Sequence, residues 1–111
     1  MLKQLFFVTT AGLAVCSSAI AEPTFMFGEG QASCGVYLDD RRTASEQQYV
    51  YVVWVRGFTS GFNYGTKGKQ VSSGLDQQTI LAYIDKYCRD KPLNGVAGAA
   101  LSLVKELGGT K

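Results

Sequence analysis

The sequence predicts an all-α protein, a small disulfide-stapled bundle of three main helices preceded by a short helical segment. Apolar residues recur at three- and four-residue steps in 44–64, 77–90 and 92–107, which is the spacing of amphipathic helices. Two cysteines, Cys34 and Cys88, are placed to join the first segment to the second main helix. The chain has 111 residues, 46% of them hydrophobic, which is enough for one small domain.

Residues 1–21 have the pattern of a secretory signal, so 22–111 are expected to form a single mature domain. Lys3 supplies the positive start, Leu5–Val15 forms an apolar stretch, and Ala19-x-Ala21 offers a cleavage site. The apolar stretch is shorter than the ~20 residues that a membrane-spanning helix needs, so stable membrane insertion is not expected. We therefore expect a periplasmic or secreted protein, cleaved after Ala21.

Cleavage would leave two of the three cysteines, Cys34 and Cys88. Lipid attachment at Cys16 is disfavoured, because Val15 stands where a small residue is required. The two remaining cysteines have one intramolecular pairing, which an oxidising compartment favours over a free thiol or a metal site. The loop that this disulfide closes would stabilise the domain by roughly 4 kcal/mol. That is a large share of the roughly 5–10 kcal/mol available to a domain of this size.

The mature domain is expected to begin with an extended lead-in over 22–32. Cys34 then opens the short helical segment, in which Tyr37 and Leu38 follow at near-helical spacing. The charged residues of 39–42 are expected to form a solvated corner that ends this segment.

The first main helix is expected over 44–64, with Thr43 and Glu46 forming a capping box at its start. Residues 49–55 (YVYVVWV) have the β-branched and aromatic content of a strand, so a buried strand there is the alternative. The helix is preferred because the following residues keep a helical spacing. Its expected apolar stripe comprises Val50, Trp54, Gly57, Phe58, Gly61, Phe62 and Gly65.

Two glycines of this stripe need a reason, because each Gly costs about 1 kcal/mol relative to Ala inside a helix. Close approach of another helix or an aromatic ring at Gly57 and Gly61 would compensate, and a weakened, kinked half-helix is the alternative. The following residues, 65–75, contain Gly and Lys but match no phosphate-binding fingerprint, so a solvated loop is expected.

The remaining helices have clearer signals. Asp76 can cap 77–90, whose apolar face is expected to contain Ile80, Leu81, Ile84, Tyr87 and Cys88. Pro92 suits the first position of the helix expected over 92–107, and Gly108–Gly109 should end it. The apolar face of that helix is expected to comprise Leu93, Val96, Ala97, Ala100, Leu101, Val104 and Leu107.

Composition argues against several classes of function. The chain contains no His, which excludes Ser-His and Cys-His catalysis and removes the commonest metal ligand. The paired carboxylates Asp39 and Asp40 are adjacent on the expected corner, so they would not face each other across a cleft. A net charge of +2 lacks the basic excess of a nucleic-acid binder. We expect no enzyme, no cofactor and no bound metal.

Protein binding is the more plausible activity, because thirteen aromatic residues are many for one small domain. A helix with large apolar residues on nearly every side cannot bury all of them, which leaves some for a second copy, another protein or unfolded clients. The candidate surface comprises Tyr51, Trp54, Phe58 and Phe62. The alternative is that this helix is simply the centre of the bundle.

Segments 33–38 (SCGVYL) and 84–92 (IDKYCRDKP) resemble the motifs around the two cysteines of the small periplasmic acid-stress chaperones HdeA and HdeB, the second being closer to HdeB. The resemblance covers roughly 30–107 and implies a helical bundle with a Cys34–Cys88 disulfide. The layout is also similar to that of the Rap/Tai periplasmic immunity proteins, which neutralise secreted toxins. Gly57, Gly61 and the stretch 61–64 match no feature of the chaperones, so the fold can transfer without the function.

An acid-activated chaperone is the leading hypothesis. Without His, a pH switch must rest on carboxylates, whose reference pKa values lie near ~4. Protonation of all nine acids would leave the mature chain with a charge of about +11, and the repulsion would loosen the fold and expose the aromatic stripe. The alternatives are an immunity or inhibitor protein with one cognate toxin, and a structural component of an envelope assembly.

Overall fold

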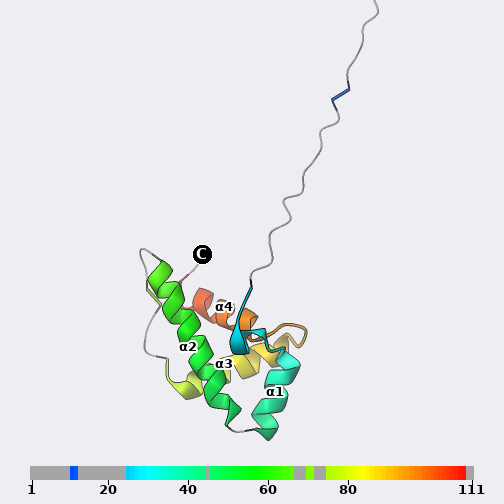
Figure 1. Ribbon diagram of the computed structural model, residues 1–111, viewed down its shortest axis with the longest axis vertical. Coiled ribbons are helices and arrows are strands. Elements are labelled where there is room, and N and C mark those ends of the chain that lie inside the picture. Colours follow the sequence, from blue (N-terminus) through cyan, green and yellow to red (C-terminus); the bar gives the residue numbers. More distant parts are fainter. Residues whose placement is uncertain (1–10, 13–24, 45, 67–69, 72–74, 110–111) are drawn as a thin grey trace, which may run out of the picture.

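Four α-helices and one short 3-10 helix form the fold in the computed structural model (Figure 1), which describes residues 11–12, 25–44, 46–66, 70–71 and 75–109. In chain order they are η1 (Gly28–Gln31), α1 (Cys34–Thr43), α2 (Gln47–Gly65), α3 (Gln77–Asp90) and α4 (Val96–Glu106). These residues contain no strand, so the predicted all-α bundle is confirmed. Apart from residues 11–12, the expected signal and its cleavage site lie outside the described residues.

The aromatic segment 49–55 lies within α2, so the helical interpretation is confirmed and the strand alternative is wrong. The face that α2 buries differs from the expected stripe: Tyr51, Val52 and Val55 are buried, whereas Val50 is exposed. Sequence spacing alone did not separate these faces, because apolar residues occupy nearly every position of this stretch. Among the described residues, no helix or aromatic ring approaches Gly57 or Gly61 as was expected, since a Cβ atom added at either would meet nothing within 4 Å.

The expected charged corner and capping box are both wrong. Residues 39–42 belong to α1, which begins after Ser33, whose hydroxyl accepts a hydrogen bond from the Val36 amide at 3.2 Å. Thr43 is the last residue of α1, and its hydroxyl donates to the Asp39 carbonyl at 2.9 Å instead of capping α2. An early and well-capped start lets α1 continue through the charged residues, and its two arginines in the last turn suit the helix dipole.

α3 spans the predicted residues, and Asp76 caps it by accepting a hydrogen bond from the Thr79 amide at 2.7 Å. α4 begins at Val96 rather than at Pro92. The reason is that the Val96 amide donates to the Ala32 carbonyl and the Cys34 amide to the Asn94 carbonyl, which holds the chain extended against the start of α1. Gly108 adopts a φ of 81° just beyond α4, so the predicted glycine stop is confirmed.

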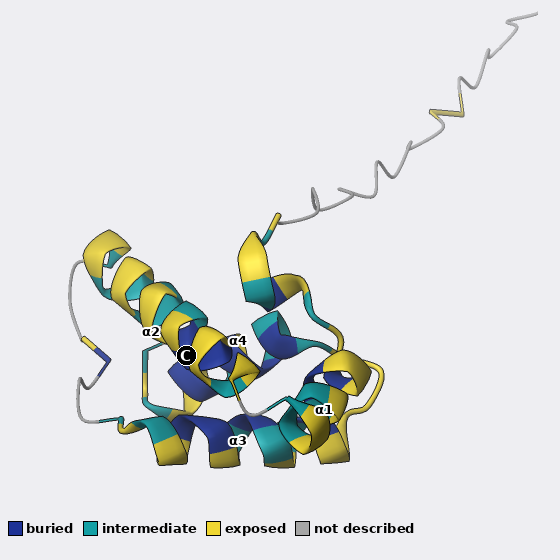
Figure 2. Ribbon diagram, turned by 60° about the horizontal axis from the view of Figure 1, so that its bottom comes forward, coloured by how far each residue is buried: buried dark blue, intermediate teal, exposed yellow. Residues whose placement is uncertain are grey.

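The core lies between α2, α3 and α4 and is closed at one end by α1. Figure 2 shows that α3 buries the face turned toward α2 and α4 and exposes the opposite face. Leu93 and Leu101, expected on the apolar face of α4, are exposed, while Ala99 and Leu103 are buried in their place. Within the described ranges, no helix combines the length and apolar character needed to cross a membrane. The buried cluster comprises Cys34, Tyr37, Tyr51, Val52, Val55, Ile80, Leu81, Ile84, Cys88, Val96, Ala99, Ala100 and Leu103.

Two glycine substitutions should have opposite effects on stability. Gly57→Ala should raise the free energy of unfolding by about 0.5–1 kcal/mol, because the position is helical and open. Gly95→Ala should lower it by about 1–3 kcal/mol, because its Cβ would lie 2.8 Å from the Ala32 carbonyl oxygen. Urea unfolding in dilute solution measures both, and equal effects would contradict the packing described here.

Candidate functional site

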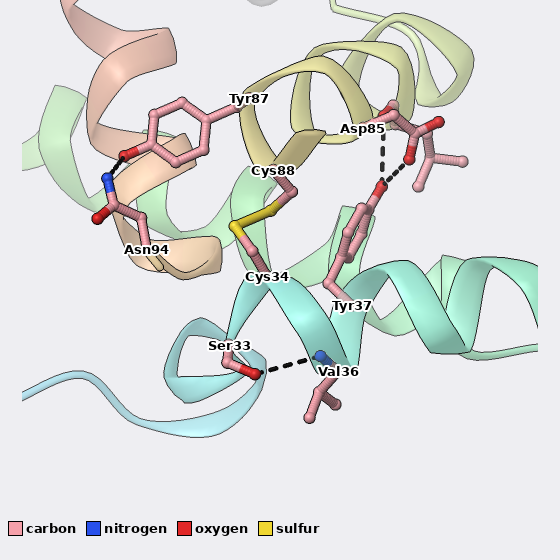
Figure 3. The surroundings of a disulfide bond; sticks show 9 residues. Ser33, Cys34, Val36, Tyr37, Asp85, Tyr87, Cys88 and Asn94 are labelled. Atoms are coloured by element: carbon pink, nitrogen blue, oxygen red, sulfur yellow. Dashed lines mark hydrogen bonds between the residues drawn. A yellow bond between two sulfur atoms is a disulfide. The ribbon is translucent and has the colours of Figure 1, made fainter. Parts of the chain in front are cut away.

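The site is built around the Cys34–Cys88 disulfide, which joins the first residue of α1 to the last turn of α3 (Figure 3). The two Cα atoms are 4.9 Å apart and both side chains are fully buried. The predicted pairing is therefore confirmed. Because the Cys34 amide also donates to the Asn94 carbonyl at 2.9 Å, the same residue ties α1 to the turn before α4.

Asp85 provides a second link between α1 and α3, close to the disulfide (Figure 3). The Tyr37 hydroxyl donates to its Oδ1 at 2.8 Å, and the Arg41 guanidinium donates to both carboxylate oxygens at 2.9 Å. Such a bidentate, charge-assisted pair is stronger than an exposed ion pair. Arg41 was assigned to a solvated corner from the sequence, so this role was missed.

The ionisation of this cluster follows from its partners. Burial alone would raise the pKa of Asp85, but the hydrogen bonds from Arg41 and Tyr37 outweigh burial and hold that pKa below its usual value. Burial, and then the hydrogen bond to Asp85, raises the pKa of Tyr37. The Tyr37 hydroxyl therefore stays protonated and acts as a donor at every physiological pH.

Asp40 links α1 to α2 in a similar way. The Tyr51 hydroxyl donates to its Oδ2 at 2.6 Å, and burial followed by this hydrogen bond raises the pKa of Tyr51. The Tyr51 ring also packs edge to face on Tyr37, with ring centroids 4.9 Å apart. Tyr51, a predicted member of the protein-binding surface, is only 1% exposed and belongs to the core of the folded protein.

Trp54 and Phe58, two further members of the predicted surface, stack with ring centroids 5.5 Å apart, and both are half-buried. Trp54 lies against η1. The Trp54 indole donates to the Phe27 carbonyl at 2.6 Å. A Cβ atom on Gly30 would lie 1.9 Å from the indole ring, so only glycine allows η1 to lie this close. Residues 28–31, expected to belong to an extended lead-in, thus form a short helix that covers Trp54. The sequence pattern did not indicate this contact.

Phe62, the fourth predicted residue, is half-buried, and the segment that follows α4 approaches it: a Cβ atom on Gly109 would lie 2.9 Å from its ring. Tyr51, Trp54, Phe58 and Phe62 therefore all lie toward the bundle, and none is freely exposed. The large apolar residues that α2 does expose are Tyr49, Val50, Val53 and Tyr64.

A groove of about 350 Å³ lies between α3 and α4. Its lining balances two positive and two negative side chains, and the Tyr83 hydroxyl lies 2.8 Å from the Ser102 hydroxyl at its edge. Lys86 pairs with Asp90 at 2.6 Å, and the Lys91 ammonium lies 5.2 Å from the centroid of the Tyr87 ring. The lining residues are Tyr83, Lys86, Tyr87, Asp90, Lys91, Ser102 and Glu106.

Comparisons with protein-family models, curated proteins and solved structures find no match to this chain. In the part of the chain that the structure describes, no three His, Cys, Asp or Glu side chains gather as they would to hold a metal ion. The protein is thus defined by its geometry: a disulfide-linked helical bundle whose first helix is also held by hydrogen bonds that involve the carboxylates of Asp40 and Asp85.

Asp85→Asn should lower the free energy of unfolding at pH 7 by about 2 kcal/mol, because it leaves Arg41 and Tyr37 without their ionised acceptor. The pKa of Asp85 is lower in the fold than in the unfolded chain. The carboxylate therefore stabilises the fold above pH ~4, and this contribution is lost as the pH falls through its lower, folded-state pKa.

Urea unfolding at several pH values measures this difference. The gap between the native protein and Asp85→Asn should close in strong acid. Asp39→Asn is the matched control, because Asp39 pairs with Arg42 on the exposed side of α1 and its loss should change stability far less. A gap that is independent of pH would contradict the role assigned to Asp85.

Proposed function

We propose that the protein is a non-enzymatic, exported protein-binding module of the HdeA/HdeB type, which binds unfolding client proteins in strong acid. The observation that carries the proposal is the arrangement of the links to α1. Asp40 and Asp85 accept the hydrogen bonds that hold α1 to α2 and α3, whereas the Cys34–Cys88 disulfide does not titrate.

Acid would weaken the hydrogen-bonded links of α1 but would leave the Cys34–Cys88 disulfide intact. As the pH falls through the folded-state pKa of Asp85, which lies below its usual value, Asp85 loses the charge that pairs with Arg41. Protonation of the remaining carboxylates makes the chain strongly positive. α1 would then be held mainly by the disulfide. Since the helices would separate while the chain stays connected at Cys34 and Cys88, the aromatic rings would become accessible without complete unfolding.

The surface that opens would include Tyr51, Trp54 and Phe58. The Tyr51 hydroxyl donates its hydrogen bond directly to Asp40. Trp54 is covered by η1, and its indole donates a hydrogen bond to the carbonyl of Phe27, the residue before η1. Large aromatic surfaces bind exposed apolar segments of other proteins with little need for sequence specificity. This supports a chaperone that recognises unfolded clients and acts only when its own fold has loosened.

We expect the protein to suppress aggregation of an acid-sensitive dehydrogenase at about pH 2–3 and to have little effect at pH 7, as followed by light scattering. Trp54→Ala combined with Phe58→Ala should reduce the protection at least severalfold. Leu93→Ala is the control, because Leu93 is also apolar but is exposed on the turn before α4. Equal inactivity of the native protein at both pH values would refute the proposal.

An immunity or inhibitor protein is the second candidate, and the groove between α3 and α4 favours it. Two tyrosines beside balanced charges are typical of an interface that recognises one partner in the folded state. A single toxin that binds at pH 7, and whose binding is lost in Glu106→Lys, would support this function. Promiscuous client binding in acid that is unchanged by Glu106→Lys would exclude it.

A further inference from the structure

The chain contains two asparagines, Asn63 and Asn94, and the structure places them in opposite situations. The Asn63 amide is held at both ends, because its Nδ2 donates to the Val71 carbonyl at 3.1 Å and its Oδ1 accepts from the Val71 amide at 2.8 Å. Asn63 lies within α2 and is followed by Tyr64. Asn94 is exposed in the turn between α3 and α4, and it is followed by Gly95. Asn94 therefore combines an accessible side chain with a following residue that has none.

The backbone nitrogen of Gly95 is not engaged in the contact between this turn and the start of α1. Ser33 and Gly95 form an isolated antiparallel bridge, and the two hydrogen bonds of the bridge are made by the residues on either side of them. In such a pair the N–H groups of the two bridged residues point away from each other. Among the described residues, the Gly95 amide donates no hydrogen bond.

A single hydrogen bond holds the Asn94 side chain. Its Nδ2 donates to the Tyr87 hydroxyl at 2.9 Å, as Figure 3 shows. Both groups are close to solvent, and water can replace a hydrogen bond of this kind at little cost. The Asn94 side chain can therefore leave Tyr87 and turn its carboxamide carbon toward the Gly95 nitrogen.

We propose that Asn94 and Gly95 form a site of spontaneous deamidation in the folded protein. Asparagine is a chemically labile residue, and a following glycine presents no side chain that hinders ring closure. The Gly95 nitrogen attacks Cγ of Asn94: the N–Cγ bond forms, the Cγ–Nδ2 bond breaks, and the Gly95 amide proton leaves with Nδ2 as ammonia.

Solvent water then opens the resulting succinimide ring at one of its two carbonyl carbons. Attack at Cγ breaks the new N–Cγ bond and leaves aspartate at position 94. Attack at the main-chain carbonyl carbon breaks the original peptide bond and leaves isoaspartate, whose backbone runs through Cβ and Cγ. The net change consumes one water molecule and releases one ammonia molecule.

Packing explains why this reactive pair is present. A Cβ atom on Gly95 would lie 2.8 Å from the Ala32 carbonyl oxygen, so a side chain that would shield the Gly95 nitrogen does not fit. The Asn94 carbonyl accepts from the Cys34 amide at 2.9 Å, which holds the turn against the beginning of α1. The close contact between these two segments thus requires the residue that makes Asn94 reactive.

Isoaspartate at position 94 would disturb the same contact. The carbonyl that accepts from the Cys34 amide would become part of a free carboxylate, and the backbone would gain one carbon atom before Val96. The Val96 amide donates to the Ala32 carbonyl at 3.0 Å, and the longer backbone cannot keep both hydrogen bonds at their present positions. The modified chain should therefore unfold at a lower urea concentration than the native chain, with the Cys34–Cys88 disulfide intact in both.

Mass spectrometry of proteolytic peptides tests the site after incubation of the full chain at pH 8. Position 94 should gain the mass that accompanies conversion of an amide to an acid at least tenfold faster than Asn63, and fragmentation should identify isoaspartate among the products. Asn94→Gln should abolish the change at position 94, because its longer side chain closes a less favourable ring. Equal rates at the two asparagines, or an Asn94 that stays intact, would overturn the proposal.

Urea at concentrations below the unfolding transition tests whether the folded protein reacts. The unfolded population rises steeply with urea, whereas the native population hardly changes. The rate at Asn94 should therefore stay within twofold of its value without urea. A rate that rises in parallel with the unfolded population would show that only the unfolded chain reacts, and it would overturn the proposal.

Discussion

The Cys34–Cys88 disulfide is the constraint on which the other contacts of the bundle depend. It joins the beginning of α1 to the end of α3 across 54 positions of sequence, and both of its cysteines belong to the buried cluster. Closing a loop of that length stabilises a fold by roughly 4 kcal/mol, chiefly by restricting the unfolded chain. With this point held, a helix of only ten residues can bring Tyr37 and Arg41 onto α3 and Asp40 onto α2.

The links around the disulfide differ from it in their response to pH. Asp85 and Asp40 hold the same short helix through hydrogen bonds from two tyrosines and one arginine, and protonation weakens an acceptor of that kind. One attachment of α1 is thus covalent, while two others are hydrogen bonds to carboxylates. A bundle built in this way can loosen in acid without losing its connectivity, which is the physical basis of the proposed chaperone activity.

The glycines of the chain have two different structural roles. Gly30 and Gly95 lie against an indole ring and a backbone carbonyl, where any side chain would collide. Gly57 and Gly61 have open space around them and lie on the uncharged side of α2. The first pair is explained within a single copy of the chain. No contact among the described residues explains the second pair.

The sequence by itself determined the helical class, the disulfide partners and the limits of α3, because periodic apolar residues, a strong cap and paired cysteines are local or composition-level signals. It did not determine which face of α2 is buried, because apolar residues occupy nearly every side of that helix. It also did not determine the roles of Asp40, Arg41 and Asp85, whose hydrogen bonds join residues that are 11 to 48 positions apart. Only the tertiary structure decided that Tyr51 is buried, that η1 covers Trp54 and that α4 starts at Val96. Each of these depends on a contact between segments distant in sequence, and no local pattern encodes such a contact.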